Sequence, residues 1–293
     1  MRPSLEIIEE KIPFVAVWMV TYNHEKFIEQ AIKSVMMQQT DFDFKLFIGE
    51  DCSTDTTQEL CIKLEKKYPK KINLVLNKEN LGANKNGIKT YNRVAKSSAK
   101  YIAILEGDDY WTDVYKLQKQ IDFLEENPKV SICGHSVKVV KKNNEYESWK
   151  VKDKTLVSFN DELIKNRFYT LSIVYKNVIE EYPDWIIGIP SGDWAIKLLI
   201  LEKGDGYLMK DFMGTYRSHN TGIWSSQTNL QAHKSVLKSY RMFLKCFEKH
   251  KKSIKLATVK YKLKHNLFFK DFSMYVFSDI FVLFKLGLNK ILK

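Results

Sequence analysis

Three carboxylates occur within four residues of this sequence, at Glu106, Asp108 and Asp109 around Gly107. Carboxylates this close repel one another strongly unless a cation lies among them. Mg²⁺ and Mn²⁺ favour oxygen ligands, and Mg²⁺ often binds one or two carboxylates together with substrate phosphates. The segment therefore predicts a Mn²⁺ or Mg²⁺ site, with a solvated acidic turn as the alternative.

Two further carboxylates lie where they could do chemistry. Asp193 is near the start of a predicted helix, where it could act as a general base that takes a proton from a hydroxyl. The alternative is a favourable interaction with the helix dipole of about 0.3–1 kcal/mol, which is compatible with a base because it keeps the carboxylate ionised. Asp51 ends a predicted strand and could accept hydrogen bonds from a nucleobase or a ribose, or cap the helix that follows.

Arg217 and His219 form a third candidate group. The chain contains 42 Lys but only five Arg, so Arg217 is a candidate for planar, bidentate recognition of a phosphate. His219 could reach a metal ion or a phosphate oxygen, and simple exposure in a loop is its alternative.

The first half of the sequence contains the elements that would position these residues. Short apolar runs predict strands at 14–20, 44–48, 72–76 and 101–105, separated by segments with helical spacing. This alternation predicts an α/β fold with a mostly parallel sheet and helices on both faces. Ligands of such sheets bind at the carboxyl ends of the strands, so the polar segments after the first, second and fourth strands are expected to converge there.

The second half of the sequence is less regular. The stretch 141–166 is polar and predicts a variable surface segment. The other predicted elements are strands at 130–140, 168–174 and 207–216, a helix at 194–202, and helical structure from 227 onward.

The composition is that of a globular protein, with 44% hydrophobic and 28% charged residues, which excludes collagen-like and wholly disordered chains. The four cysteines are far apart in the sequence and support neither a disulfide framework nor a zinc site, so a reducing compartment is expected. No stretch is apolar enough for a signal peptide or a membrane-spanning helix.

Positive charge is concentrated at the end of the chain. Of the 47 basic and 35 acidic residues, 15 and 3 lie in residues 230–293, which leaves 32 of each sign in the rest. The neutral body argues against nucleic acid as a partner. The basic end is also rich in aromatic residues and predicts contact with an anionic membrane surface, with packing against the body or a second subunit as the alternative. Its predicted apolar face consists of Phe269, Phe272, Val276, Leu283 and Phe284.

Six segments of the chain, in order, resemble those of family 2 glycosyltransferases of the GT-A fold, which are inverting enzymes that use nucleotide-activated sugars. They are VTYNHEKFIEQAIKSV, IGEDCSTDTT, ENLGANKNGI, YIAILEGDDYW, PSGDWAIKLL and TYRSHNTGIW, and they cover roughly residues 13–225. The resemblance implies a GT-A domain at 1–226, followed by a basic amphipathic helical extension at 227–293.

The resemblance also implies roles for the matched residues on the nucleotide side. Thr21 and Tyr22 match the turn that contacts the nucleotide, and Asp51 matches the carboxylate that reads the uracil edge. Asn86 is a further candidate for a nucleotide or sugar contact.

The acidic segment matches the D-x-D element of the family, with Glu106 in place of its first Asp. The resemblance makes Asp108 the metal ligand, with Asp109 and His219 as further candidates, and it sets Glu106 near the ribose or the sugar. Arg217 and His219 match a Y-R-x-H segment that is expected near the diphosphate.

Asp193 matches the catalytic base, although Gly192 stands where the family more often has Glu. The predicted function is an inverting, metal-dependent transfer of a sugar from a nucleotide sugar, expected to be a UDP-sugar, to a hydroxyl of a glycan or lipid-linked acceptor. We expect this reaction in bacterial surface polysaccharide or lipopolysaccharide synthesis, in the cytoplasm and peripherally on the inner face of the plasma membrane.

Two other functions stay open at this point. A nucleotidyltransferase would share the α/β plan and the acidic metal site, but it usually has a Gly- and Lys-rich loop where this chain has TYNHEKF. A non-catalytic membrane-associated scaffold with a degenerate site is the second alternative. Oligomerisation through the helical extension is also open.

Overall fold

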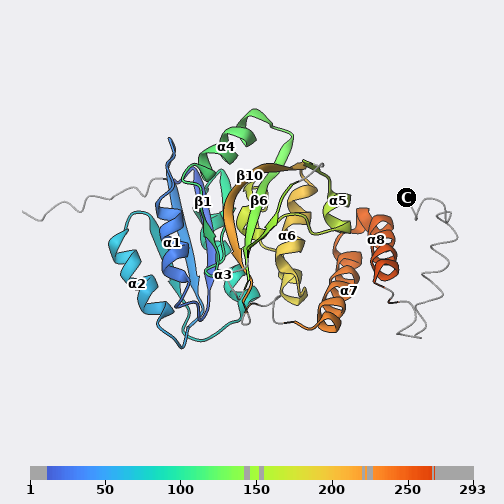
Figure 1. Ribbon diagram of the computed structural model, residues 1–293, viewed down its shortest axis with the longest axis horizontal. Coiled ribbons are helices and arrows are strands. Elements are labelled where there is room, and N and C mark those ends of the chain that lie inside the picture. Colours follow the sequence, from blue (N-terminus) through green and yellow to red (C-terminus); the bar gives the residue numbers. More distant parts are fainter. Residues whose placement is uncertain are drawn as a thin grey trace, which may run out of the picture.

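The computed structural model describes residues 12–141, 146–151, 155–219, 222, 227–265 and 267. Strands and helices alternate regularly through its first half (Figure 1). The strands are β1 (Val15–Thr21), β2 (Phe44–Glu50), β3 (Ile72–Leu76), β4 (Tyr101–Ile104), β5 (Tyr110–Trp111), β6 (Val130–Val140), β7 (Tyr146–Trp149), β8 (Leu156–Val157), β9 (Val174–Lys176) and β10 (Asp205–Arg217). The α-helices are α1 (Ile28–Met36), α2 (Thr57–Lys67), α3 (Ala83–Lys96), α4 (Lys116–Glu126), α5 (Phe159–Ile164), α6 (Gly192–Leu201), α7 (Asn229–Cys246) and α8 (Lys251–Lys264). The short 3₁₀-helices are η1 (Thr170–Ser172), η2 (Asp184–Gly188) and η3 (Glu248–His250).

These strands form one mixed sheet in the order β3-β2-β1-β4-β9-β6-β10-β5, with β7 beside β6 and β8 beside β10. Strands β1 to β4 pair in parallel, and so do β6 and β10. Strand β9 lies antiparallel between β4 and β6, and β5 is antiparallel to β10. The predicted α/β class and mostly parallel sheet are confirmed.

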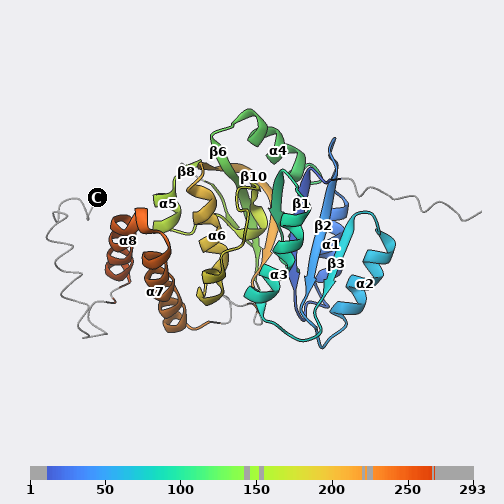
Figure 2. The ribbon, with the colours of Figure 1, turned by 180° about the vertical axis from the view of Figure 1, so that it is seen from behind.

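The alternation of side chains along β1 explains why helices cover both faces of the sheet. Val15, Val17 and Met19 point into a core that α1, α2 and α4 complete. Ala16 and Trp18 point into the opposite core, which is completed by α3, α5, α6, α7 and α8. Figures 1 and 2 show these two layers from opposite sides.

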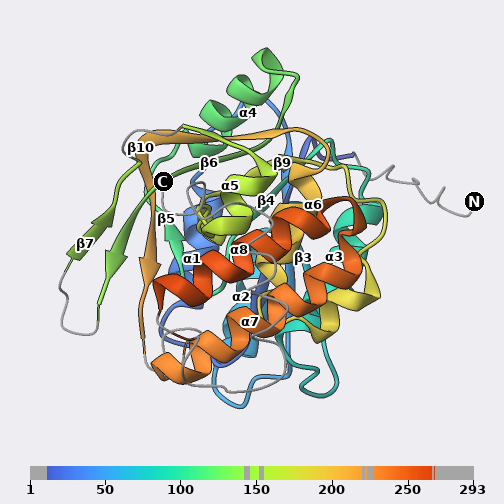
Figure 3. The same ribbon diagram turned by 90° about the vertical axis from the view of Figure 1, so that its right-hand side faces the viewer.

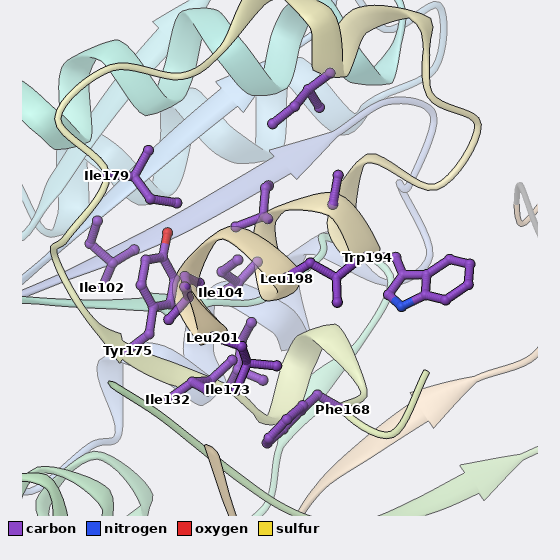
Figure 4. Packing of buried hydrophobic residues seen from close by; sticks show 14 of the residues in the cluster. Ile102, Ile104, Ile132, Phe168, Ile173, Tyr175, Ile179, Trp194, Leu198 and Leu201 are labelled. Atoms are coloured by element: carbon purple, nitrogen blue, oxygen red, sulfur yellow. The ribbon is translucent and has the colours of Figure 1, made fainter. Parts of the chain in front are cut away.

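Helix α6 is apolar on nearly all sides because it lies inside the second core. Leu198 and Leu201 belong to the same cluster as Ile132 of the sheet and Phe168, as Figure 4 shows. Trp194, at the start of the helix, packs edge-on against Tyr240 of α7. The buried helix thereby fixes the position of its own first turn, which contains Asp193.

Two parts of the second half differ from the sequence prediction. The strand predicted at 168–174 is wrong: η1 occupies its middle, and only β9 at its end is extended. Residues 168–174 are mostly apolar because they are buried on several sides. In such a run polar and apolar residues do not alternate, so periodicity alone cannot distinguish a strand from a turn. The stretch 141–166 was predicted only as a surface segment, but its described part contains α5, which begins with a capping box between Ser158 and Asp161.

Helices α7 and α8 lie side by side across the face of the molecule seen in Figure 3. Their apolar residues Tyr240, Phe243, Phe247 and Ile254 belong to the same core as Trp194. The predicted boundary at 226/227 therefore falls between β10 and two helices that share the core of the body. The predicted apolar face at 269–284 lies outside the described residues. No helix in the described part of the chain is long and apolar enough to cross a membrane.

Candidate active site

The turns after β1 and β2 are joined by hydrogen bonds at the carboxyl edge of the sheet. The Asn23 side chain accepts from the Thr54 backbone N at 2.9 Å, and the His24 backbone N donates to Thr57 Oγ1 at 2.8 Å. Asn23 and Cys52 take the left-handed backbone conformation, which lets the chain turn sharply after β1 and again after β2. These contacts form a rim next to Thr21 and Tyr22.

Thr21 and Tyr22 have different surroundings in this rim. Thr21 is buried, and its Oγ1 lies 3.1 Å from His24 Nδ1. Tyr22 is 38% exposed, so of the two it is the one that presents a surface to a ligand. Their predicted contacts with a nucleotide stay predictions.

Asp51 is the centre of a buried hydrogen-bond network. Its carboxylate accepts from Asn77 Nδ2 at 2.8 Å and from the backbone N of Leu81 and Gly82, both at 2.9 Å. Asn86, only 1% exposed, accepts from Asn77 Nδ2 at 3.0 Å and donates to the Gly49 carbonyl at 2.9 Å. Asn86 thus supports the turn before α3, and this geometry gives no support to its predicted direct contact with a nucleotide or sugar.

The acidic segment lies directly against β1. Gly107 N donates to the Val20 carbonyl at 3.1 Å. A Cβ atom at Gly107 would lie 2.6 Å from Thr21 Oγ1 and 3.0 Å from His24 Nδ1, which is closer than such atoms approach. Glycine is therefore what brings the acidic turn to the rim formed after β1.

Electrostatic strain is concentrated in this acidic turn. Burial raises the pKa of Glu106 to about 8, with the negative charges of Asp108 and Asp193 as further causes. Glu106 Oε2 is buried without a hydrogen-bond partner among the described residues. Burial likewise raises the pKa of Asp109, and Asp108 and Glu106 add to the effect. A polar group left in this state is a candidate for contact with a ligand or an ion.

Asp108 faces two histidines. Its Oδ2 lies 2.9 Å from His219 Nε2 and 3.8 Å from His24 Nε2. Burial disfavours its charge, but the hydrogen bond from His219 and the charges of both histidines outweigh burial and lower its pKa. Burial lowers the pKa of His24, although the charge of Asp108 opposes this. The structure therefore brings together Asp108 and His219, two of the candidate metal ligands, whose metal-binding role stays a prediction.

Arg217 ties the acidic turn to the end of β10. Its guanidinium donates to the Asp108 carbonyl at 2.6 Å and to Gln30 Oε1, and it lies 4.2 Å from the centre of the Tyr110 ring. Its backbone N donates to Asp109 Oδ1 at 2.8 Å. In this arrangement Arg217 holds the turn, and its predicted contact with a diphosphate stays a prediction.

Asp193 lies at the start of α6 with its side chain 30% exposed. Its Oδ2 accepts from Lys197 Nζ at 2.9 Å and from Thr170 Oγ1 at 3.3 Å. Burial opposes ionisation, but the charge and hydrogen bond of Lys197, with help from Thr170, outweigh it and lower the pKa of Asp193. An ionised carboxylate that is still accessible has the properties required of a general base.

The fold thus brings both Asp108 and Asp193 close enough to Glu106 for their negative charges to act on it. Sequence reasoning missed His24, Thr170 and Lys197. His24 stands within the TYNHE turn after the first strand, and Lys197 lies four residues after Asp193 in an otherwise apolar helix, so both had a positional signal. Thr170 had none, because its segment was predicted as a strand.

The donor atoms fit a hard divalent ion that also binds substrate phosphates. Among the described residues, no group of three His, Cys, Asp or Glu side chains could hold a metal by itself. One or two carboxylates, completed by phosphates and water, are however the usual ligands of Mg²⁺. Asp108, 19% exposed and beside His219, suits this role. Asp109 is 2% exposed and accepts from the Arg217 backbone, which favours a supporting role.

A surface hollow of about 390 Å³ lies elsewhere, at the amino ends of the strands. It is lined by Phe14, Phe42, Asp43 and Lys100 among others. It contains none of the predicted site residues, and ligands of parallel sheets bind at the opposite edge.

Comparison with known proteins gives a consistent result. The family model "Glycosyl transferase family 2" matches residues 16–183. An uncharacterised protein of Mycobacterium tuberculosis is 30% identical over 71% of this chain, and the chain spans 59% of that relative's length. TuaG of Bacillus subtilis, whose name assigns it provisionally as a teichuronic acid biosynthesis glycosyltransferase, is 28% identical over 73% of this chain and 83% of its own.

Solved structures share the fold. The crystal structure of Staphylococcus aureus TarS (residues 1–349) in complex with UDP-GlcNAc has a TM-score of 0.62 at 17% identity, covering 90% of this chain and 78% of that one. The mannosyltransferase PcManGT of Pyrobaculum calidifontis, in complex with GDP-Man and Mn²⁺, has a TM-score of 0.54 at 15% identity, covering 80% of this chain and 65% of that one.

Proposed function

The chain belongs to glycosyl transferase family 2, and we propose that it transfers a sugar from a nucleotide sugar to an acceptor hydroxyl with inversion at the anomeric carbon. The observation that carries the proposal is the position of Asp193, an accessible carboxylate paired with Lys197, close enough to the acidic turn for its charge to act on Glu106. A base on one side and a diphosphate-binding turn on the other are what a direct displacement requires.

In the proposed reaction, Asp193 accepts the proton of the acceptor hydroxyl, whose oxygen then bonds to the anomeric carbon. The bond from that carbon to the diphosphate breaks, and its electron pair leaves with the nucleoside diphosphate. A divalent ion, when bound, would supply positive charge for the departing diphosphate. Asp108 and His219 would hold it, while Arg217 keeps the turn in place through the Asp108 carbonyl.

UDP-sugars are our first choice of donor, since the TarS structure similar in fold contains UDP-GlcNAc. We place the reaction in surface polysaccharide synthesis, which is supported by the name of TuaG and by that of the Shigella flexneri relative RfbG, a dTDP-rhamnosyl transferase that is 36% identical over 36% of both chains. The acceptor is proposed to be a glycan or a lipid-linked glycan.

The test is a donor screen of the full chain with Mn²⁺ and UDP-, GDP- and dTDP-sugars, measuring release of the nucleoside diphosphate. With the active donor, Asp193→Asn should lower kcat about 10²–10⁴-fold, because a positioned base contributes that much. Donor binding should change little. Asp184→Asn, at an exposed position of η2, is the matched control. Activity of Asp193→Asn equal to wild type would remove Asp193 from this role, and pyrophosphate release from a nucleoside triphosphate would favour a nucleotidyltransferase instead.

We also propose that the helical extension binds an anionic membrane surface through charge. Exposed basic residues form one stripe along α7 at Lys234, Lys238, Arg241 and Lys245, which is helical spacing. The apolar face of α7 is already buried in the core, so within α7 charge is the available means of attachment. Each basic residue near such a surface contributes about 1 kcal/mol.

Binding to vesicles with and without anionic lipid tests this second proposal. Changing the four stripe residues to Gln should weaken binding to anionic vesicles roughly 10³-fold, which follows from about 1 kcal/mol per residue. Changing Lys63, Lys66, Lys67 and Lys70, which lie in and just after α2, is the charge-matched control. Equal binding by the stripe variant and wild type would contradict the proposal.

A further inference from the structure

Lys197 is a lysine inside the protein. It lies one helical turn after Asp193 on α6 and its side chain is 1% exposed. Its neighbours on the helix, Ile196 and Leu198, are buried and apolar. Moving an ammonium group out of water is costly unless it is paired and hydrogen-bonded, so its partners determine whether the fold tolerates it.

The Lys197 ammonium has three acceptors for its three N–H groups. Nζ lies 2.9 Å from Asp193 Oδ2, 2.8 Å from Asn166 Oδ1 and 2.9 Å from the Phe168 carbonyl. Because an ammonium has three donors and no acceptor, this set satisfies it completely. The position of Nζ is therefore fixed by Asp193 on its own helix and by Asn166 and Phe168 in the segment that follows α5.

The same contacts distinguish the two oxygens of Asp193. Oδ2 accepts from both Lys197 and Thr170. Oδ1 is the oxygen that neither of them holds. A carboxylate fixed through one oxygen cannot rotate freely, so its other oxygen has a defined direction.

The charges around Asp193 come from several elements. Glu106 follows β4, Glu162 is on α5, and Tyr182 precedes η2, and each senses the charge of Asp193. Among the described residues, Lys197 is the cation that forms an ion pair with Asp193. Burial favours protonation of Asp193, and the charge and hydrogen bond of the Lys197 ammonium oppose it.

We propose that Lys197 is a positioning residue that keeps Asp193 ionised and turned so that Oδ1 receives the proton of the acceptor hydroxyl. This inference rests on the proposed function, because it acts through Asp193 as the base. The proton moves from the acceptor oxygen to Oδ1, that oxygen bonds to the anomeric carbon, and the diphosphate leaves with the electrons of the bond that breaks. Lys197 itself exchanges no proton in this step.

The direct test is the titration of Asp193 by ¹³C NMR of its carboxyl carbon, assigned by the signal missing in Asp193→Asn. Lys197→Met removes the charge and keeps an unbranched chain. We expect its Asp193 midpoint to rise by roughly 1–3 pH units, which is the usual effect of an adjacent cation. The acidic limb of the kcat profile, measured at saturating Mn²⁺ and donor, should move upward by the same amount, with donor KM within about twofold of wild type. Lys203→Met, at an exposed position just after α6, is the matched control.

A purely structural role for Lys197 would lower kcat by one factor at every pH and leave the Asp193 midpoint in place, and that result would overturn the inference. Lys197→Arg keeps the charge and serves if the Met variant does not fold. It should retain the wild-type midpoint, and an upward shift would overturn the inference equally. If Asp193→Asn is fully active, the proposed base and this inference both fail. An inactive Asp193→Asn together with an unshifted midpoint in the Lys197 variants leaves the proposed function standing and removes only the inference.

Discussion

Two polar clusters lie at the carboxyl edge of the same sheet, and they are built in opposite ways. The cluster around Asp51 pairs its carboxylate with an amide side chain and two backbone N–H groups. The acidic turn instead leaves Glu106 Oε2 without a partner in the part of the chain that the structure describes, and it sets carboxylates against one another. Satisfied buried groups rigidify a fold, whereas unsatisfied ones are costly until something binds. The first cluster is therefore the support, and the second is where we expect a ligand to complete the site.

Among changes in these two clusters, the largest effect should come from one that forces the acidic turn away from the rim formed after β1. In Gly107→Ala the new methyl group would lie 2.6 Å from Thr21 Oγ1, so the acidic turn must move. A displacement of about 1 Å in an active site can cost 10²-fold in rate, and we expect a loss of about that size in kcat. Gly87→Ala is the control, since its methyl group would lie 3.4 Å from Trp18 Cζ2, an ordinary contact. Similar activity of both variants would contradict the close packing described here.

Loss of the Asp51 carboxylate should destabilise the folded protein. Asp51→Ala leaves the Asn77 amide and the N–H groups of Leu81 and Gly82 without their acceptor. An unsatisfied buried group costs about 1–3 kcal/mol, so we expect the free energy of unfolding to fall by about 3 kcal/mol. Urea unfolding measures it. A loss below about 1 kcal/mol would show that the network is not the support we describe.

Ligand binding should stabilise the acidic turn. Each of Mn²⁺ and UDP, present at 100 times its Kd, should raise the free energy of unfolding by about 2.7 kcal/mol, and EDTA should remove the gain that depends on the ion. Thermal unfolding with UDP alone, Mn²⁺ alone and both separates the contributions. In Asp108→Asn the part due to Mn²⁺ should largely disappear. A full Mn²⁺ response in that variant would place the ion elsewhere.

The smallest effect concerns stability without metal, where Glu106→Gln should stabilise the protein. The folded pKa of Glu106 is raised from 4.5 to about 8, so between these values the unfolded chain ionises while the folded one keeps its proton. Stability of the wild type then falls with rising pH across this window relative to the variant. We expect no difference below pH 4.5 and a gain of about 1–3 kcal/mol at pH 8, measured in EDTA. A variant less stable than wild type at pH 8 would contradict the raised pKa of Glu106.

The same contrast explains what the sequence could predict. The strands of the first half were predicted because each is a short apolar run ending in polar residues, and Ile72–Leu76 matches in both bounds. The sequence also predicted a functional role for Glu106, Asp108 and Asp193, because charged residues next to apolar segments stand out. The predicted ligand contact of Asn86 stays a prediction, because a buried structural amide and a ligand-binding amide look identical in sequence. Thr170 required the tertiary path of η1, which is set by packing rather than by a local period.

Helix α7 also touches the start of α6. Ser239 Oγ lies 3.4 Å from Ser191 Oγ, two residues before Asp193, and Tyr240 packs edge-on against Trp194 at 5.3 Å between ring centres. A surface that holds α7 would therefore also fix the height and tilt of the reaction centre above that surface. Attachment through α7 would then also select acceptors by their distance from the surface, since only hydroxyl groups presented at the height of Asp193 could reach it.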